Sequence, residues 1–189
     1  MTSSDSLHRA ADGFRKVVAQ VGDDQWGVAT PCDGWTVRQL VGHVAAGCQM
    51  AATLAAGGTR QDAIGVLGID HLGDRPVEAV DAALDAQQAA FEQPGVDSQV
   101  FEHPAGDMPG VQVIRFRLGD LLVHQWDLAR AIGADETLDP GLVAEVWDGI
   151  APMIPMMANS GVFGSGPSGD VADDAPAQVR LLDAMGRRP

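Results

Sequence analysis

Residues 117–131 read RLGDLLVHQWDLARA, a stretch with the spacing of an amphipathic helix. We expect the helix to run from about Val111 to Ile132 and to end at Gly133. One face of this helix is polar and the opposite face is apolar. The polar face carries Arg117, Asp120, His124 and Asp127, and the apolar face carries Leu118, Leu122, Trp126 and Ala129.

Three segments upstream have the same helical periodicity: residues 7–21, 36–56 and 76–91. The second begins with a capping-box pattern, in which Thr36 and Gln39 satisfy each other's backbone N–H groups. The apolar stripes are Leu7, Ala10, Ala11, Phe14, Val17, Val18 and Val21 in the first segment, Val37, Leu40, Val41, Val44, Cys48, Ala51 and Ala55 in the second, and Val77, Val80, Ala83, Leu84, Gln87 and Phe91 in the third.

Four long helices predict an all-α fold, a four-helix bundle with long connections. Asp139-Pro140 is a typical start for a fifth helix, which must kink or end near Pro152 and Pro155. A short C-terminal helix is expected within residues 174–185. We find no strand run and no internal repeat. Residues 1–189 are therefore expected to form a single domain, with a loop and tail over 160–189.

Composition excludes several classes of function. The 189 residues include 12 basic and 26 acidic side chains, a net charge of -14, which disfavours binding to nucleic acid or to an anionic membrane surface. No apolar run approaches the length of about 20 residues that crosses a bilayer. The N-terminus lacks the charged and apolar regions of a signal peptide. We therefore expect a cytoplasmic protein whose cysteines are reduced.

The first candidate site is a metal centre. Asp120 and His124 are four residues apart, so on a helix their side chains point the same way, one turn apart. His43 lies in the middle of the second predicted helix, which could bring it to that pair. Two imidazoles and one carboxylate suit catalytic zinc, iron or a similar divalent ion. On the pattern alone two alternatives stay open. Asp120 and His124 could belong to a solvated face, which is the more frequent outcome, and His43 could be a core histidine.

The other candidate residues carry weaker signals. Cys32 and Cys48 have no basic neighbour in sequence, so both are expected to be buried, inert thiols. Glu102, His103 and Asp107 fall in a predicted loop and could line the mouth of a pocket, and the usual polarity of turns explains them equally well.

Two motifs together resemble a known family. They are TPCDGWTVRQLVGHV at residues 30–44 and the stretch 117–131, and they are similar to the actinobacterial metal-binding branch of the DinB-like superfamily. This branch includes the N-terminal domain of mycothiol-dependent maleylpyruvate isomerase and the mycothiol S-transferases. The resemblance extends over nearly the whole chain, including HLGDRP at residues 71–76 and APAQVRLLDAMGR at residues 175–187.

The resemblance implies a DinB-like four-helix bundle and a divalent metal held by His43, Asp120 and His124. Zinc is the expected ion, with Ni²⁺ and Fe²⁺ as alternatives. The isomerase has Glu where this chain has Asp120, and the shorter side chain could shift the metal. Asp127 and Arg130 are expected to form an i,i+3 ion pair, and Trp126 is expected to pack in the core. The resemblance also places the polar stripe at the open end of the bundle, which favours the metal site over a solvated face.

The function implied is thiol chemistry, with mycothiol as cosubstrate and a small electrophile as substrate. A metal-stabilised thiolate adds to the electrophile in a transferase; addition, bond rotation and elimination give an isomerase. The isomerase has a further C-terminal domain, whereas this sequence has a short tail, so we expect a transferase or a related enzyme. The alternatives are a metal or small-molecule carrier without turnover, a structural bundle that forms a homodimer, and metal-activated hydrolysis.

Overall fold

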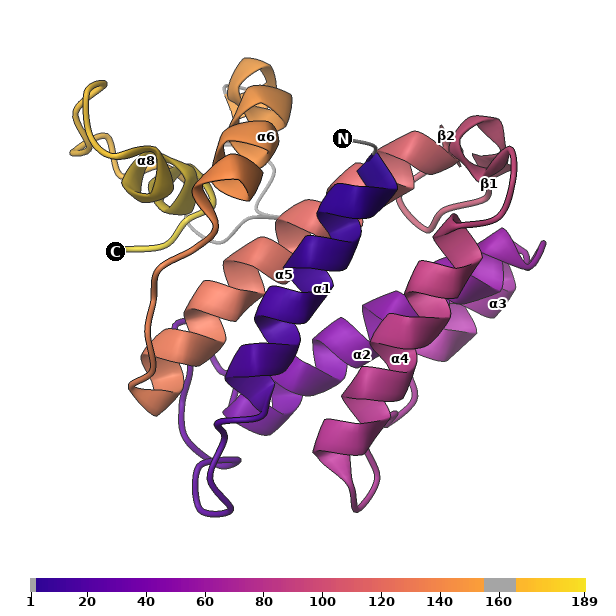
Figure 1. Cartoon of the computed structure of the whole chain (residues 1–189), viewed down its shortest axis with the longest axis horizontal. Coiled ribbons are helices and arrows are strands. Elements are labelled where there is room, and N and C mark those ends of the chain that lie inside the picture. Colours follow the sequence, from indigo (N-terminus) through magenta and orange to yellow (C-terminus); the bar gives the residue numbers. More distant parts are fainter. Residues whose placement is uncertain (1–2, 155–165) are drawn as a thin grey trace.

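Four helices form a ring in the computed structural model, which describes residues 3–154 and 166–189. α1 packs against α5 and α4, and α2 packs against the same two helices (Figure 1). This arrangement confirms the predicted all-α bundle. The four helices are α1 (Ser3–Val18), α2 (Val37–Ala55), α4 (Pro76–Phe91) and α5 (Gly110–Ile132).

Local signals set most helix boundaries. The Thr36 hydroxyl accepts a hydrogen bond from the Gln39 N–H, and the Gln39 side chain accepts one from the Thr36 N–H, so the predicted capping box is present. α6 (Pro140–Ile150) begins after Asp139, whose carboxylate accepts hydrogen bonds from two backbone N–H groups of the first turn. Gly133 ends α5 with φ of 71°, in the left-handed region.

The predicted apolar stripes meet in one core. In α1 every apolar residue from Leu7 to Val18 in the predicted stripe is buried, and Val21 packs at the edge. Trp126 is only 1% exposed, as expected of a packing residue. The largest fully buried side chains come from several helices: Phe14, Leu40, Leu54, Leu84, Ile114, Leu118, Leu121, Leu122, Trp126, Leu128 and Leu142, with Phe101 from the hairpin.

The connections contain elements that periodicity did not predict. α3 (Arg60–Leu67) occupies a glycine-rich segment and has its own capping box. A 3-10 turn, η1 (Val96–Ser98), precedes a hairpin of β1 (Val100–Phe101) and β2 (Met108–Pro109). The prediction of no strands was wrong for these two. Strands of two residues are too short to produce an alternating pattern.

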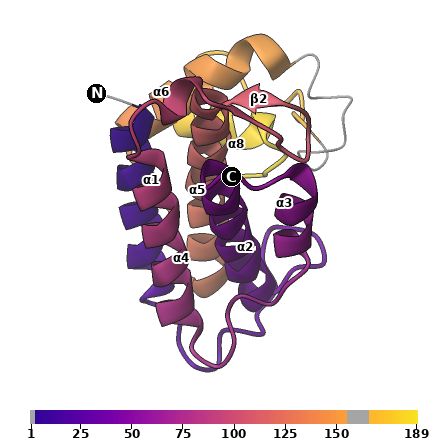
Figure 2. The same ribbon diagram turned by 90° about the vertical axis from the view of Figure 1, so that its right-hand side faces the viewer.

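The C-terminal part of the chain adds two helices beside the ring. α6 contacts α5, and α8 (Ala177–Ala184) packs against α6 (Figure 2). Pro152 falls in a short 3-10 turn, η2 (Ala151–Met153), after α6 as expected, whereas Pro155 lies outside the described residues. Across residues 3–154 and 166–189, no helix has both the length and the apolar character needed to span a membrane.

Candidate metal centre

The structure brings the three predicted metal ligands together where α2 and α5 pack side by side. His43 Nε2 lies 3.2 Å from Asp120 Oδ1, and His124 Nε2 lies 3.4 Å from the same oxygen. The side chains of His43, Asp120 and His124 are 38%, 24% and 10% exposed. The cluster is therefore neither a solvated face nor part of the core: His124 is nearly buried, whereas His43 is partly exposed to solvent.

The spacing of the donor atoms fits a divalent ion. In a tetrahedral zinc shell with bonds of about 2.0–2.1 Å, neighbouring donor atoms lie about 3.3 Å apart. The two distances from Asp120 Oδ1 match this value, and all three donor atoms lie within 4.8 Å of one another. The shorter side chain of Asp120 thus still reaches both histidines.

Arg117 fixes the orientation of the Asp120 carboxylate from the buried side. Its Nη1 donates to Asp120 Oδ2 at 2.8 Å, so Oδ1 alone faces the histidines. Its Nε donates to Gln87 Oε1 at 2.8 Å, and its Nη2 donates to the Val44 carbonyl at 3.3 Å and to the Cys48 sulfur at 3.4 Å. The side chain of Arg117 is only 6% exposed, so it forms a buried support for Asp120.

Asp127 fixes the orientation of the His124 imidazole through its Nδ1 atom. His124 Nδ1 lies 2.9 Å from Asp127 Oδ2, in a side chain with no exposed surface. A carboxylate that accepts the Nδ1 proton leaves Nε2 available as a metal ligand. The predicted ion pair between Asp127 and Arg130 was wrong. Arg130 pairs with Glu136 and stacks over the Trp126 ring at 4.2 Å, because it points outward where Asp127 points inward.

Arg187, near the C-terminal end of the sequence, completes the support of Asp127. Its Nη2 donates to Asp127 Oδ2 at 2.6 Å, and its Nε donates to Asp127 Oδ1 at 3.0 Å. Sequence reasoning missed Arg187 as a site residue, since it is 60 residues from Asp127 and no spacing rule connects the two. The only signal was the resemblance of residues 175–187 to the family.

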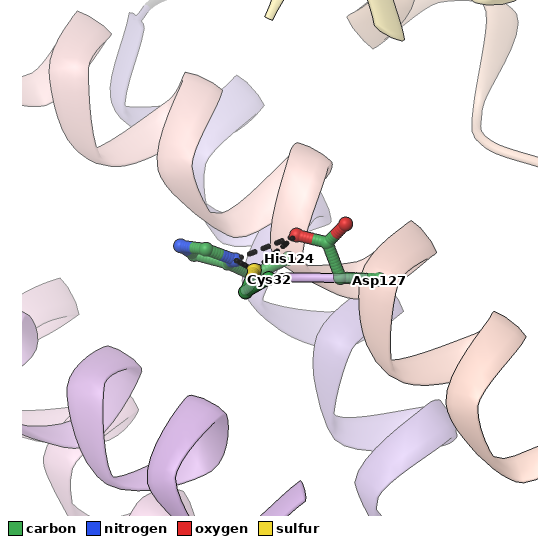
Figure 3. Close-up of side chains that lie close together, drawn as sticks. All are labelled: Cys32, His124 and Asp127. Carbon is green, nitrogen blue, oxygen red and sulfur yellow. Dashed lines mark hydrogen bonds and ion pairs between the residues drawn. The ribbon is translucent and has the colours of Figure 1, made fainter. Parts of the chain in front are cut away.

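The loop before α2 delivers two more side chains. Trp35 lies with its ring centroid 4.9 Å from that of His43 and 6.0 Å from that of His124. Cys32 lies with its sulfur 3.2 Å from Asp127 Oδ2 and 3.9 Å from His124 Nδ1 (Figure 3). The loop is closed by hydrogen bonds from the Trp35 N–H to the Cys32 carbonyl and from the Thr30 N–H to the Trp35 carbonyl.

The expectation of two buried, inert thiols holds for Cys48 and is wrong for Cys32. Cys48 is fully buried, and burial raises the pKa of its thiol, although the Arg117 cation opposes the effect. Cys32 is half-buried and contacts His124, Asp127 and Arg187. Its basic neighbours come from distant parts of the chain, so the local sequence could not reveal them.

Charge shifts the protonation of the central pair. Burial by itself raises the pKa of Asp120, but the Arg117 and His124 cations hold it well below the usual range. Burial by itself lowers the pKa of His124, but the Asp120 carboxylate, together with hydrogen bonds to Asp120 and Asp127, raises it well above the usual value. Without a metal, these shifts favour an imidazolium between the two carboxylates, so a metal ion that binds His124 competes with a proton.

The predicted pocket-mouth residues form a structural clamp. Arg60 forms an ion pair with Asp107 and donates from Nε to the His103 carbonyl at 3.1 Å, while its backbone N–H donates to Glu102. These contacts tie α3 to the hairpin. Burial, followed by the charges of Arg117 and Arg60, lowers the pKa of His103.

Comparisons with known proteins relate most of the chain to one family. The family model described as the mycothiol maleylpyruvate isomerase N-terminal domain matches residues 7–129. The uncharacterized proteins MT0763 and Rv0738 of two Mycobacterium tuberculosis strains, CDC 1551 / Oshkosh and ATCC 25618 / H37Rv, are each 37% identical over 137 residues, covering 72% of this chain and 71% of the relative.

The fold is also that of a solved enzyme. The crystal structure of the mycothiol-dependent maleylpyruvate isomerase superposes with a TM-score of 0.62 at 15% identity, covering 82% of this chain and 70% of that chain. A histidine-to-alanine mutant of the enzyme gives a TM-score of 0.61. At this identity the likeness establishes the fold. Together with the model match over most of the chain, it means that the protein belongs to the mycothiol maleylpyruvate isomerase N-terminal domain family.

Proposed function

We propose that the protein is a divalent-metal-dependent enzyme that uses mycothiol as its thiol and a small electrophile as its substrate. The reaction is either transfer of the thiol to the electrophile or isomerisation of the electrophile. The observation that carries the proposal is the convergence of His43 Nε2, His124 Nε2 and a single oxygen of Asp120. The family assignment supports mycothiol as the thiol. His43, whose side chain is 38% exposed, gives a small molecule access to the cluster.

The protein's own residues have separable roles in this proposal. His43, Asp120 and His124 would hold the cation, for which zinc is our first choice. The chemistry that a bound divalent cation supplies is stabilisation of a thiolate near neutral pH. Arg117 keeps Asp120 ionised and directs one oxygen to the site, and Asp127 directs Nε2 of His124 to the same point.

Two reactions of a thiolate fit such a site. Addition of the sulfur to an activated alkene or epoxide, with a proton returned to the product, is transfer. Addition to a conjugated cis double bond, rotation, and elimination of the same thiolate is isomerisation. We place transfer first. The same geometry also serves the second candidate, a carrier that binds metal and a small molecule without turnover.

The first experiment measures metal content by elemental analysis of untagged protein. We expect about one equivalent of a divalent ion in the wild type and its loss in His43→Ala and His124→Ala. His8→Ala is the matched control, since His8 lies on the surface of α1 beside Asp12, away from the cluster. A wild type without metal after reconstitution contradicts the proposal.

The second experiment separates an enzyme from a carrier. Metal-loaded protein is incubated with mycothiol and a panel of maleyl compounds, activated alkenes and epoxides. Consumption of the electrophile by the wild type, with at least a hundredfold loss in His124→Ala, supports an enzyme. Saturable binding of mycothiol without turnover of any electrophile supports the carrier instead.

A further inference from the structure

A second set of potential metal donor atoms lies on the Nδ1 side of His124. Cys32, His124 and Asp127 lie close together (Figure 3), with Cys32 Sγ, His124 Nδ1 and Asp127 Oδ2 within 4.8 Å of one another. His124 belongs to both sets. Thiolate, imidazole and carboxylate are all good ligands for zinc. A metal ion could therefore bind His124 on either nitrogen, and the protein needs a feature that selects one.

Arg187 already places a cation at the second set. Its Nη2 lies 2.6 Å from Asp127 Oδ2 and 3.3 Å from the Cys32 sulfur, and its Nε reaches the other oxygen of Asp127 at 3.0 Å. The Arg187 side chain is 12% exposed, and the Asp127 side chain has no exposed surface. Both oxygens of Asp127 are thus engaged by the side chain of Arg187.

The end of α8 directs Arg187 to this position. The Arg187 N–H donates to the Leu182 carbonyl at 2.8 Å, and the Gly186 N–H donates to the Asp183 carbonyl at 2.9 Å, the two bonds of a Schellman motif. Gly186 has φ of 77°, which glycine adopts without strain. Arg130 then donates to the Arg188 carbonyl at 2.9 Å, which ties the tail to α5.

We propose that Arg187 is a positioning residue that determines which donor set binds the metal. Its guanidinium occupies the place of a cation beside Asp127 and Cys32, so the metal ion binds His43, Asp120 and His124 Nε2. With Arg187 in place, Asp127 accepts the Nδ1 proton of His124, and Nε2 faces His43 and Asp120. Without Arg187, the buried carboxylate of Asp127 loses the guanidinium that binds both of its oxygens. A divalent ion that binds Cys32, Asp127 and Nδ1 would then restore the charge balance. This inference rests on the metal binding in the proposed function.

Cobalt substitution tests the inference, since a thiolate ligand gives Co²⁺ a near-ultraviolet charge-transfer band that nitrogen and oxygen ligands lack. Metal-free wild type, Arg187→Gln, Arg187→Lys and Arg188→Gln are titrated with Co²⁺ after circular dichroism has shown that each is folded. We expect one equivalent bound without the sulfur band in the wild type. Arg187→Gln should bind about tenfold more weakly or worse. It should also gain the band, which Cys32→Ser should remove in the double variant.

The other two variants separate charge from general disruption of the tail. Arg187→Lys keeps a cation near Asp127, so its cobalt spectrum should lack the sulfur band. Arg188→Gln removes the neighbouring ion pair with Asp183 and should match the wild type. If Arg187→Gln does not fold, Arg187→Lys decides the question: a sulfur band in the folded Lys variant overturns the inference.

The outcomes distinguish this inference from the function on which it rests. A wild type that binds no cobalt overturns the metal-dependent function, and the selection by Arg187 with it. A wild type that binds cobalt with the sulfur band leaves metal binding intact and overturns the selection. Equal cobalt affinity and equal spectra in the wild type and Arg187→Gln also leave metal binding intact and overturn the selection by Arg187.

Discussion

At the scale of single residues, the site depends on how the two oxygens of Asp120 are divided. Oδ2 accepts from Arg117 at 2.8 Å, and Oδ1 faces His43 and His124 at 3.2 and 3.4 Å. A free carboxylate rotates and can bind a metal through both oxygens. One that is held by a buried guanidinium presents a single oxygen in a set direction. The support of Asp120 is therefore as important to the site as Asp120 itself.

Replacing Arg117 by Met tests this support. The change leaves Asp120 Oδ2 and Gln87 Oε1 without their charged donor. We expect the free energy of unfolding to fall by about 3 kcal/mol, the lower end for a broken buried pair, because Asp120 is 24% exposed. Urea denaturation of the metal-free protein measures the change. Arg115→Met, at an exposed position of α5, should stay within about 0.5 kcal/mol of the wild type.

The raised pKa of His124 predicts a pH dependence of stability in the metal-free protein. Folding favours the charged imidazole, so its contribution is fully present below about pH 6.5 and is lost as the pH rises through the raised pKa. Asp120 has the opposite sign: its contribution is present above about pH 3.9 and is lost as the pH falls through its lowered pKa.

We therefore expect the free energy of unfolding, measured with EDTA present, to decrease from pH 6.5 upward. The slope should approach about 1.4 kcal/mol per pH unit between pH 6.5 and the raised pKa of His124. His124→Gln should flatten this part of the curve. A wild-type profile parallel to that of His124→Gln between pH 6.5 and 9 would contradict the charge assignment.

At the scale of elements, α5 presents a polar stripe to the interior, against α2. Arg117, His124 and Asp127 are 5%, 8% and 0% exposed. The helical pattern alone favours a solvated face for such a stripe, whereas the family resemblance favours a metal site, and three of the four residues are buried in the structure. The reason lies in α2, where Gly47 leaves space for the guanidinium of Arg117. A small residue on one helix thus makes room for a large charged residue on its neighbour.

Gly47→Ala should show that this space is required. An added Cβ would lie 2.2 Å from Arg117 Nη1 and 2.7 Å from its Cζ, and four hydrogen-bond partners keep the guanidinium from moving aside. We expect a loss of about 1–3 kcal/mol from overpacking, in spite of the better helix propensity of Ala. Thermal and urea unfolding of the metal-free protein measure it.

Gly42→Ala is the matched control on the same helix. Its added Cβ would meet Leu72 Cδ1 at 3.6 Å, an ordinary contact. Helix propensity then predicts a gain of up to about 1 kcal/mol. If Gly47→Ala were as stable as Gly42→Ala, the close approach of α2 and Arg117 would not constrain the sequence.

At the scale of the whole molecule, net charge opposes the compact state. The 12 basic residues balance 12 of the 26 acidic charges, which leaves 14 negative charges uncompensated. Raising the ionic strength from about 0.01 to 0.15 M shortens the screening length from about 30 to 8 Å and weakens this repulsion. The exposed ion pairs that salt also weakens contribute little.

We therefore expect the melting temperature of the metal-free protein at pH 7 to rise over this range of NaCl. Sodium sulfate at equal ionic strength is the control, and it should give the same rise, because screening at low salt depends on ionic strength alone. A fall in melting temperature would mean that the ion pairs outweigh the net repulsion. A rise in sulfate alone would indicate exclusion of the salt from the protein surface.

The four long helices and the three proposed ligands could be predicted from the sequence alone. Periodicity and caps are local properties, so the capping box at Thr36 and the start of α6 could be predicted. The four-residue spacing of Asp120 and His124 is local as well. His43 was joined to that pair by two motifs whose resemblance to one family extends across the chain.

The charged groups that support those ligands could be identified only once the chain was folded. Arg117 reaches Gln87 on α4, and Arg187 reaches Asp127 across 60 residues, whereas the nearby Arg130 turns outward to Glu136. Every carboxylate in the sequence has several arginines that could pair with it. An ion pair forms in the interior where folding removes both of its charges from water side by side, because each charge then offsets the desolvation of the other. The packing of the helices and the tail determines which charges meet in this way.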